Sequence, residues 1–244
     1  MIRIAAVGDV HLGPDAAGHL RPALEQLGGC ADVLLLAGDL TKHGSLDEAL
    51  VVAEEFAELP VPVLAVLGNH DHHADVPEQV AELLTGHGIT VLEGAAVTLT
   101  VGGCRLGVAG VKGFGGGFAG KCGSAFGERE MKTFINHTTG ISERLADALH
   151  GLDCDITVAL THYSPVTDTL KGEPPEIYPF LGSYLLAEAI DSAGADLAVH
   201  GHAHFGTEHG STPGGVRVRN VAQPVIKSAY QVYCLEPAVA ATSA

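Results

Sequence analysis

Short, largely apolar runs recur along this chain, and polar residues follow closely after each of them. Each run holds three to six residues and is bounded by glycine, proline or a polar cluster, which is typical of strands buried on both faces. The runs therefore predict buried strands. They cover Ile2–Val7, Val33–Ala37, Pro62–Leu67, Ile156–Leu160 and Leu197–Val199.

Segments with helical periodicity lie between these strands. Ser45 is a candidate N-cap because Glu48 follows three residues later, and Pro77 fits the first turn of another helix. The predicted helices cover residues 19–29, 45–58, 75–85, 128–150 (with a break allowed near 138–140) and 183–193. Strand–helix alternation implies right-handed crossovers, so we expect an α/β fold with a mostly parallel sheet.

Antiparallel strands are expected in the second half of the chain. Residues 97–101 and 105–109 flank a Gly-Gly pair and predict a hairpin. Residues 216–221 and 231–235 predict closing antiparallel strands. Because no linker separates these segments, we expect a single domain over residues 1–237 and a loose C-terminal tail over residues 238–244.

Two segments are too rich in glycine or proline for regular structure. Residues 112–127 are glycine-dense and carry three phenylalanines. They fit either a flexible surface loop or a backbone-lined wall beside a site. Residues 164–179 contain four prolines and fit a lid or partner contact or, as the favoured interpretation, an ordinary surface loop.

Composition narrows the classes of partner. Of 244 residues, 46% are hydrophobic and 17% charged, and 29 acidic against 13 basic residues give a formal charge of −16. Such a surface repels phosphate backbones and anionic lipids, which disfavours nucleic acid and membranes as partners. The five cysteines are scattered without a CxxC pair, and no apolar stretch resembles a signal peptide or a membrane span. We therefore expect a soluble, cytoplasmic protein with reduced thiols, and the oligomeric state stays open.

Polar residues that can bind metals follow each of the five buried strands. They are Asp9 and His11, then Asp39, then Asn69 and His70, then His162, then His202 and His204. Because the carboxyl ends of parallel strands meet at one edge of a sheet, we expect these side chains to converge there. Carboxylates and neutral imidazoles together favour manganese, iron or zinc over calcium, and the lack of cysteine ligands argues against a structural zinc site.

The order of these blocks resembles the calcineurin-like metallophosphoesterase superfamily. The matching blocks are Asp9-Val10-His11, Gly38-Asp39, Gly68-Asn69-His70-Asp71, His162 and Gly201-His202-Ala203-His204. The resemblance extends from residue 2 to about residue 220. It implies a four-layer α/β/β/α sandwich of two mixed sheets flanked by helices.

The resemblance also implies a role for each matched residue. Asp9, His11 and His204 are similar to the ligands of a first metal, Asn69, His162 and His202 to those of a second, and Asp39 to the bridge between them. His70 is similar to the family's non-ligand histidine near the leaving group. We expect two divalent or trivalent ions, about 3.5–4 Å apart, that hold a hydroxide for in-line attack on phosphorus. His70 would then protonate the leaving oxygen or stabilise its charge, or would only position the substrate.

A departure from one branch of the superfamily narrows the substrate. Protein Ser/Thr phosphatases carry an acid and an arginine where this chain has Lys42 and His43. The sequence looks more like the small bacterial-type phosphodiesterase branch. We therefore expect a hydrolase of small-molecule phosphate esters, above all small phosphodiesters. A nuclease of the same superfamily and a non-catalytic metal-binding scaffold are the alternatives.

Further polar residues have simpler explanations. His200 is interpreted as a packing residue at a strand end, and His72 and His73 as solvated turn residues. Surface positions are expected for His19, His87, His137, His150 and His209. Lys112, Lys121 and Arg129 could meet an anionic substrate, but scattered cations are more often part of a solvated face.

Overall fold

The computed structural model describes residues 1–237 of the chain, and the predicted tail at 238–244 lies outside the described residues. The strands are β1 Ile2–Val7, β2 Val33–Ala37, β3 Val63–Val66, β4 Ile89–Val91, β5 Ala95–Val101, β6 Cys104–Val111, β7 Gly117–Phe118, β8 Lys121–Cys122, β9 Ile156–Thr161, β10 Leu197–His200, β11 His209–Ser211, β12 Arg217–Asn220 and β13 Gln231–Leu235. The α-helices are α1 Arg21–Leu24, α2 Leu27–Cys30, α3 Leu46–Phe56, α4 Pro77–Gly86, α5 Arg129–His150, α6 Tyr178–Leu181, α7 Tyr184–Ala193 and α8 Gln223–Ile226.

The strands form two large mixed sheets. The first has the order β13-β1-β2-β3-β4, with β1 to β4 parallel and β13 antiparallel to β1. The second has the order β11-β12-β10-β9-β6-β5, in which β12, β10, β9 and β6 are parallel. Its edge strands β11 and β5 are antiparallel to their neighbours. The hairpin predicted across the Gly-Gly pair is thus confirmed as β5–β6.

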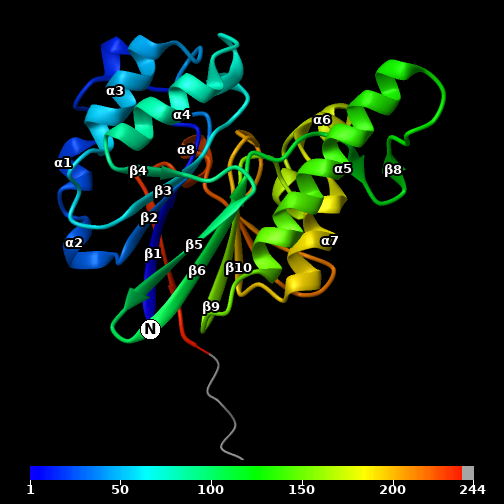
Figure 1. The fold of residues 1–244 in the computed structure, drawn as a ribbon. Coiled ribbons are helices and arrows are strands. Elements are labelled where there is room, and N and C mark those ends of the chain that lie inside the picture. The colour runs from blue at the N-terminus through cyan, green and yellow to red at the C-terminus, as the bar shows by residue number, and fades with distance from the viewer. Residues whose placement is uncertain (238–244) are drawn as a thin grey trace, which may run out of the picture.

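Helices cover the outer face of each sheet, and the inner faces pack against each other (Figure 1). Helices α1 to α4 lie over the first sheet, and α5 and α7 lie over the second. Apolar side chains fill all three interfaces between the four layers. The four-layer α/β/β/α sandwich implied by the resemblance is therefore confirmed.

Strand β2 shows why the apolar runs are continuous. Leu34 and Leu36 pack toward the helices, whereas Val33, Leu35 and Ala37 pack toward the second sheet. Successive side chains of a strand point to opposite faces, and here both faces are covered. Every position of the strand is therefore apolar.

Two predicted helix starts are confirmed. Ser45 caps α3 through a reciprocal pair in which its hydroxyl accepts from the backbone N–H of Glu48 while the Glu48 carboxylate accepts from that of Ser45. Pro77 occupies the first turn of α4. Ser45 thus fixes where α3 begins, and Pro77 fits the first turn of α4.

Three local predictions are wrong, at least in part. Residues 19–29, predicted as one helix, instead form two short helices, α1 and α2, which are separated at Glu25 and Gln26. Helix α5 runs without a break, since the hydroxyls of Thr138 and Thr139 donate to carbonyls one turn earlier and do not compete with the helix. Strand β12 is antiparallel to β11 as predicted, but it is parallel to β10, because the chain first forms the edge strand β11 and then turns back.

Parts of both irregular segments are more buried than a surface loop would be. Residues 112–118 are buried or half-buried, which fits the interpretation as a wall beside a site. Residues 119–127 are exposed, which fits the interpretation as a surface loop. In 164–179, Ser164, Thr169 and Leu170 are fully buried, which overturns the favoured surface-loop interpretation for that part. Among residues 1–237, no helix combines the length and apolar character needed to cross a membrane.

Candidate metal centre

The predicted site residues lie where the parallel strands end. In the first sheet, Asp9 and His11 follow β1, Asp39 follows β2, and Asn69 and His70 follow β3; in the second, His162 follows β9, and His202 and His204 follow β10. Two groups of possible ligand atoms each lie within 4.8 Å of one another. The first cluster is Asp9, His11, Asp39 and His204, and the second cluster is Asp39, His162 and His202. Asp39 belongs to both.

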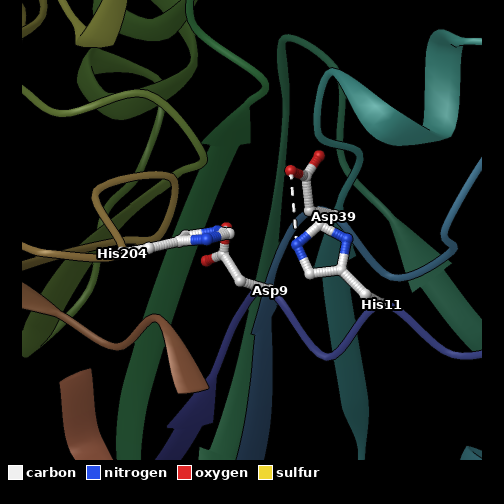
Figure 2. A group of neighbouring side chains, drawn as sticks. All are labelled: Asp9, His11, Asp39 and His204. Carbon is white, nitrogen blue, oxygen red and sulfur yellow. Dashed lines mark hydrogen bonds and ion pairs between the residues drawn. The ribbon is translucent and has the colours of Figure 1, made fainter. Parts of the chain in front are cut away.

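The first cluster joins two loops of the first sheet to one loop of the second (Figure 2). Nε2 of His204 lies 2.9 Å from Oδ1 of Asp9, and Nε2 of His11 lies 3.9 Å from Oδ2 of Asp39. The His11 Nε2 is buried and has no hydrogen-bond partner within residues 1–237. An unpaired imidazole nitrogen beside two buried carboxylates fits a bound cation.

In the second cluster, the tautomer of His162 is fixed by its surroundings. Its Nδ1 donates to the carbonyl of Ala37 at 2.8 Å, so Nε2 carries the free lone pair. That lone pair faces Oδ1 of Asp39 at 3.3 Å, an oxygen that only accepts when the carboxyl is ionised. Two buried acceptors facing each other repel unless a cation lies between them. The second cluster therefore also fits a metal.

Asn69 and His202 complete the surroundings of the second cluster. Asn69 Oδ1 lies 3.0 Å from His162 Nε2, so the amide is adjacent to the second cluster. His202 donates from Nε2 to the carbonyl of Phe180 at 3.3 Å, leaving Nδ1 free to bind a ligand. This carbonyl was not anticipated from the sequence, because no sequence pattern marks a backbone oxygen.

His70 is adjacent to both clusters but belongs to neither. Its backbone N–H donates to Oδ1 of Asp39 at 2.8 Å, and its Nδ1 donates to the carbonyl of Lys42 at 2.7 Å. Its Nε2 lies 4.0 Å from Oδ2 of Asp39, and its side chain is 42% exposed. The ring is thus held from behind and presents Nε2 toward the site.

Several of these residues have a strained backbone. Four of the seven non-glycine residues with positive φ in the described chain are predicted ligands, namely Asp9, His11, Asp39 and His202, with φ between 42° and 70°. This conformation costs free energy for residues with a side chain, and it clusters at functional sites. Glycine is needed beside them: a Cβ on Gly68 would overlap the Asp39 carboxylate, and one on Gly201 the Asp9 carboxylate.

Burial and charge explain the protonation of the ligands. Burial, and then the charge on Asp39, raise the pKa of Asp9 to about 6, although the hydrogen bond from His204 opposes this. Burial lowers the pKa of His162 well below its ordinary value, and burial with nearby His162 lowers that of His202 to about 3. Neutral imidazoles beside closely spaced carboxylates are suited to borderline divalent cations.

Asp71 ends the Gly68-Asn69-His70-Asp71 block and belongs to neither cluster. Its fully buried carboxylate accepts from the backbone N–H groups of Gly68 at 2.8 Å and Thr41 at 2.8 Å, and from that of Leu40 at 3.1 Å. It therefore ties the loop that carries Asp39 to the loop that carries Asn69. The signal was present, because an acid directly after a ligand block often orients it.

The remaining candidates divide into two groups. His200 is fully buried and hydrogen-bonds Thr169 Oγ1 at 2.8 Å, which fits its interpretation as a packing residue. The five predicted surface histidines are exposed. His72, by contrast, is half-buried rather than solvated, and Lys112 is only 7% exposed, so neither belongs to a solvated face. Lys121 and Arg129 are exposed.

Two facing mixed sheets with carboxylate–histidine clusters at their common edge define the class of α/β/β/α metallohydrolases. The model of the calcineurin-like phosphoesterase family matches residues 2–206, and the chain belongs to this family. It is therefore a metal-dependent phosphoesterase. A comparison with curated proteins finds no match.

Solved structures share the fold at low identity. A phosphopantetheinyl hydrolase from Mycobacterium tuberculosis is 18% identical over 96% of both chains, with a TM-score of 0.67. GAP50 of Plasmodium, described as the anchor in the inner membrane complex, is 14% identical over 91% of this chain and 72% of its own, with a TM-score of 0.52. A Staphylococcus aureus protein described as a candidate 5′-nucleotidase is 15% identical over 90% of this chain and 48% of its own, with a TM-score of 0.55.

Proposed function

We propose that this chain is a dinuclear hydrolase of small phosphate esters, with phosphodiesters as its preferred substrates. The observation that carries the proposal is that two ligand clusters share one carboxylate, Asp39, at the edge where both sheets end. Asp9, His11 and His204 would hold one ion, Asn69, His162 and His202 the other, with Asp39 between them. When bound, the ions supply positive charge at the phosphoryl oxygens and lower the pKa of the attacking water.

The chain's own contribution is to orient these groups before the substrate arrives. Backbone carbonyls fix the rings of His162 and His202, and the single backbone N–H of His202 donates to both oxygens of Asp9, at 3.0 and 2.9 Å. Ligands held in this way reorganise little during reaction, which is the main source of electrostatic catalysis. The rigidity of the strand ends therefore serves the chemistry directly.

His70 is the proposed proton donor to the leaving oxygen. Because its Nδ1 hydrogen is held by the carbonyl of Lys42, Nε2 is the atom at which the ring would take up a proton and, as the imidazolium, donate it. Nε2 lies 4.0 Å from Asp39 Oδ2, hence beside the shared ligand, and the ring is accessible from solvent. A charged imidazole there would also stabilise the negative charge that develops on the leaving group.

Sequence and charge support a small-molecule substrate. Lys42 and His43 replace the acid and arginine of the protein phosphatase branch, and a formal charge of −16 disfavours a nuclease. Because a phosphopantetheinyl hydrolase shares the fold, a phosphopantetheinyl ester should be among the substrates tested. GAP50 shares the fold and is named as an anchor, so a non-catalytic scaffold is the alternative to test.

The test is hydrolysis after reconstitution with manganese, iron or zinc. The panel holds bis-nitrophenyl phosphate, nitrophenyl phosphate, cyclic nucleotides, a phosphopantetheinyl ester and single-stranded DNA. Wild type should hydrolyse the diesters in a metal-dependent way, while Asn69→Ala and His162→Ala should lose one equivalent of metal and most of the rate. His87→Ala, at an exposed position on the end of α4, is the matched histidine control and should change neither. Two bound metals without turnover on any ester would favour the scaffold.

A further inference from the structure

Lys112 is a buried cation beside the second cluster. It directly follows β6, and its carbonyl accepts from the backbone N–H groups of His162 at 2.9 Å and Tyr163 at 3.0 Å. Its own N–H donates to Oε2 of Glu93 at 3.0 Å. The backbone of Lys112 is therefore fixed on both sides, in register with the candidate ligand His162.

Aromatic rings direct the ammonium group. Nζ of Lys112 lies 5.1 Å from the centre of the Phe114 ring and 5.6 Å from that of Tyr163. The Tyr163 ring centre is in turn 4.3 Å from that of His202. Between Lys112 and Phe114, Gly113 adopts a φ of +80°, and a Cβ there would press on Tyr163. The sharp turn at Gly113 thus lets Phe114 and Tyr163 both contact the ammonium. On its other side, Tyr163 contacts His202 of the second cluster.

The ammonium has no counter-ion in the described protein. None of the ion pairs within residues 1–237 includes Lys112. The nearby carboxylate of Glu93 is already engaged, because Oε1 pairs with Arg144 at 3.4 Å and Oε2 accepts the Lys112 N–H. Two cation–π contacts are weaker than the hydration that a buried ammonium loses.

The surrounding titratable groups do not supply the missing negative charge. Burial lowers the pKa of Lys112, although the charges on Glu93 and Asp39 oppose this. Burial, and then the charge on Lys112, lower the pKa of His72 to about 4, and the same two causes lower that of His137. Both imidazoles are therefore neutral at neutral pH, and the lysine is the local positive charge.

We propose that Lys112 is a substrate contact whose ammonium binds a non-bridging oxygen of the phosphate ester held at the second cluster. The inference rests on the proposed function and deepens it by naming a specificity-determining residue outside the metal ligands. A fixed cation beside the metals also explains how a chain of formal charge −16 can attract an anionic substrate. Because the contact is electrostatic, its loss should weaken the binding of a doubly charged phosphate more than that of a singly charged diester.

The test measures binding of inorganic phosphate to the metal-loaded full-length protein by calorimetry, alongside metal content. Lys112→Met should weaken phosphate binding about 10- to 100-fold, as expected for loss of a hydrogen bond to a charged group, and should leave the metal content unchanged. Lys112→Arg should recover part of the loss. Lys132→Met, at an exposed position on α5, is the matched control and should bind phosphate like wild type.

Kinetics separate a substrate contact from a structural role. In Lys112→Met, KM should rise more for nitrophenyl phosphate than for bis-nitrophenyl phosphate. Unchanged phosphate binding, or a loss of metal in parallel with activity, would overturn the inference. If wild type binds metals and phosphate but hydrolyses no ester, the proposed function fails while the Lys112 contact stands. Should the Met variant not fold, phosphate should still protect Lys112, and not Lys132, from acylation of the wild-type protein; equal labelling with and without phosphate would also overturn it.

Discussion

The two clusters share Asp39 but hold their other ligands in different ways. The first cluster combines two carboxylates with two imidazoles, and the side chains of His11 and His204 are 23% and 35% exposed. The second cluster has one carboxylate and two imidazoles with the Asn69 amide beside them, and His162 is fully buried. The first cluster thus has two carboxylates and is partly open, whereas the second has one carboxylate and is more enclosed.

The difference separates two ways of preparing a metal site. In the first cluster, Asp9 and Asp39 are buried close together, so a cation relieves their repulsion. In the second, hydrogen bonds to backbone carbonyls set the imidazole orientation before any ion binds. We therefore expect the first cluster to depend on the charge of its ion and to exchange it faster, and the second to keep its shape without one.

Removal of the shared carboxylate should have the largest effect. Asp39→Ala deletes the one residue common to both clusters, so both ions should be lost. The kcat should fall on the order of 10³-fold or more, because metal stabilisation of the phosphoryl charge contributes several kcal/mol. Metal analysis and steady-state kinetics check this. A variant that keeps one full equivalent and a tenth of the rate would show that Asp39 does not bridge.

Single-cluster variants should separate the two sites. His11→Ala and His162→Ala should each retain one equivalent of metal, with kcat reduced about 10²- to 10³-fold. Only His162→Ala should also lower thermal stability, because it leaves a cavity and an unpaired carbonyl at Ala37. Calorimetric metal titration and thermal unfolding check both. If each variant loses both ions, the clusters do not act as separate sites.

The sequence predicted the second cluster and the first cluster equally well, because both depend on strand ends. Largely apolar runs located β1, β2, β3, β9 and β10, and the ligand candidates lay among the first few residues after each run. Parallel pairing then places these ends at one edge. The direction of β12, the unbroken α5 and the burial of Lys112 could not be predicted, since each depends on contacts with residues far away in the sequence.

Replacing His70, the proposed proton donor, should affect substrates unequally. His70→Gln should lower kcat about 10²-fold for an alkyl ester but much less for a nitrophenyl ester, whose leaving group needs no proton. Metal content should stay at the wild-type value, since His70 belongs to neither cluster. Equal losses on both esters would assign His70 a positioning role instead.

Variants of Asp71 should test whether both clusters depend on the hydrogen bonds that join the Asp39 loop to the Asn69 loop. Asp71→Ala leaves the N–H groups of Gly68, Leu40 and Thr41 without their acceptor, which should cost about 2–4 kcal/mol of unfolding free energy. Metal affinity should fall about 10- to 100-fold, mainly at the second cluster, because Asn69 lies on the tethered loop. Denaturant unfolding and metal titration measure the two effects. Asp71→Asn, which keeps one acceptor oxygen, should lie between the alanine variant and wild type.

The smallest effect should come from Ser45, the N-cap of α3, which follows the loop that carries Asp39. Ser45→Ala removes the hydroxyl that accepts from Glu48 at 3.3 Å, and should lower the unfolding free energy by about 1 kcal/mol. The Glu48 carboxylate still accepts from the backbone N–H of His43 at 2.7 Å, so the loop that carries Asp39 should keep its course. Both metal equivalents and kcat should therefore match wild type. A loss of metal in this variant would mean instead that the start of α3 determines the position of Asp39. The rigidity of both clusters would then depend on that helix.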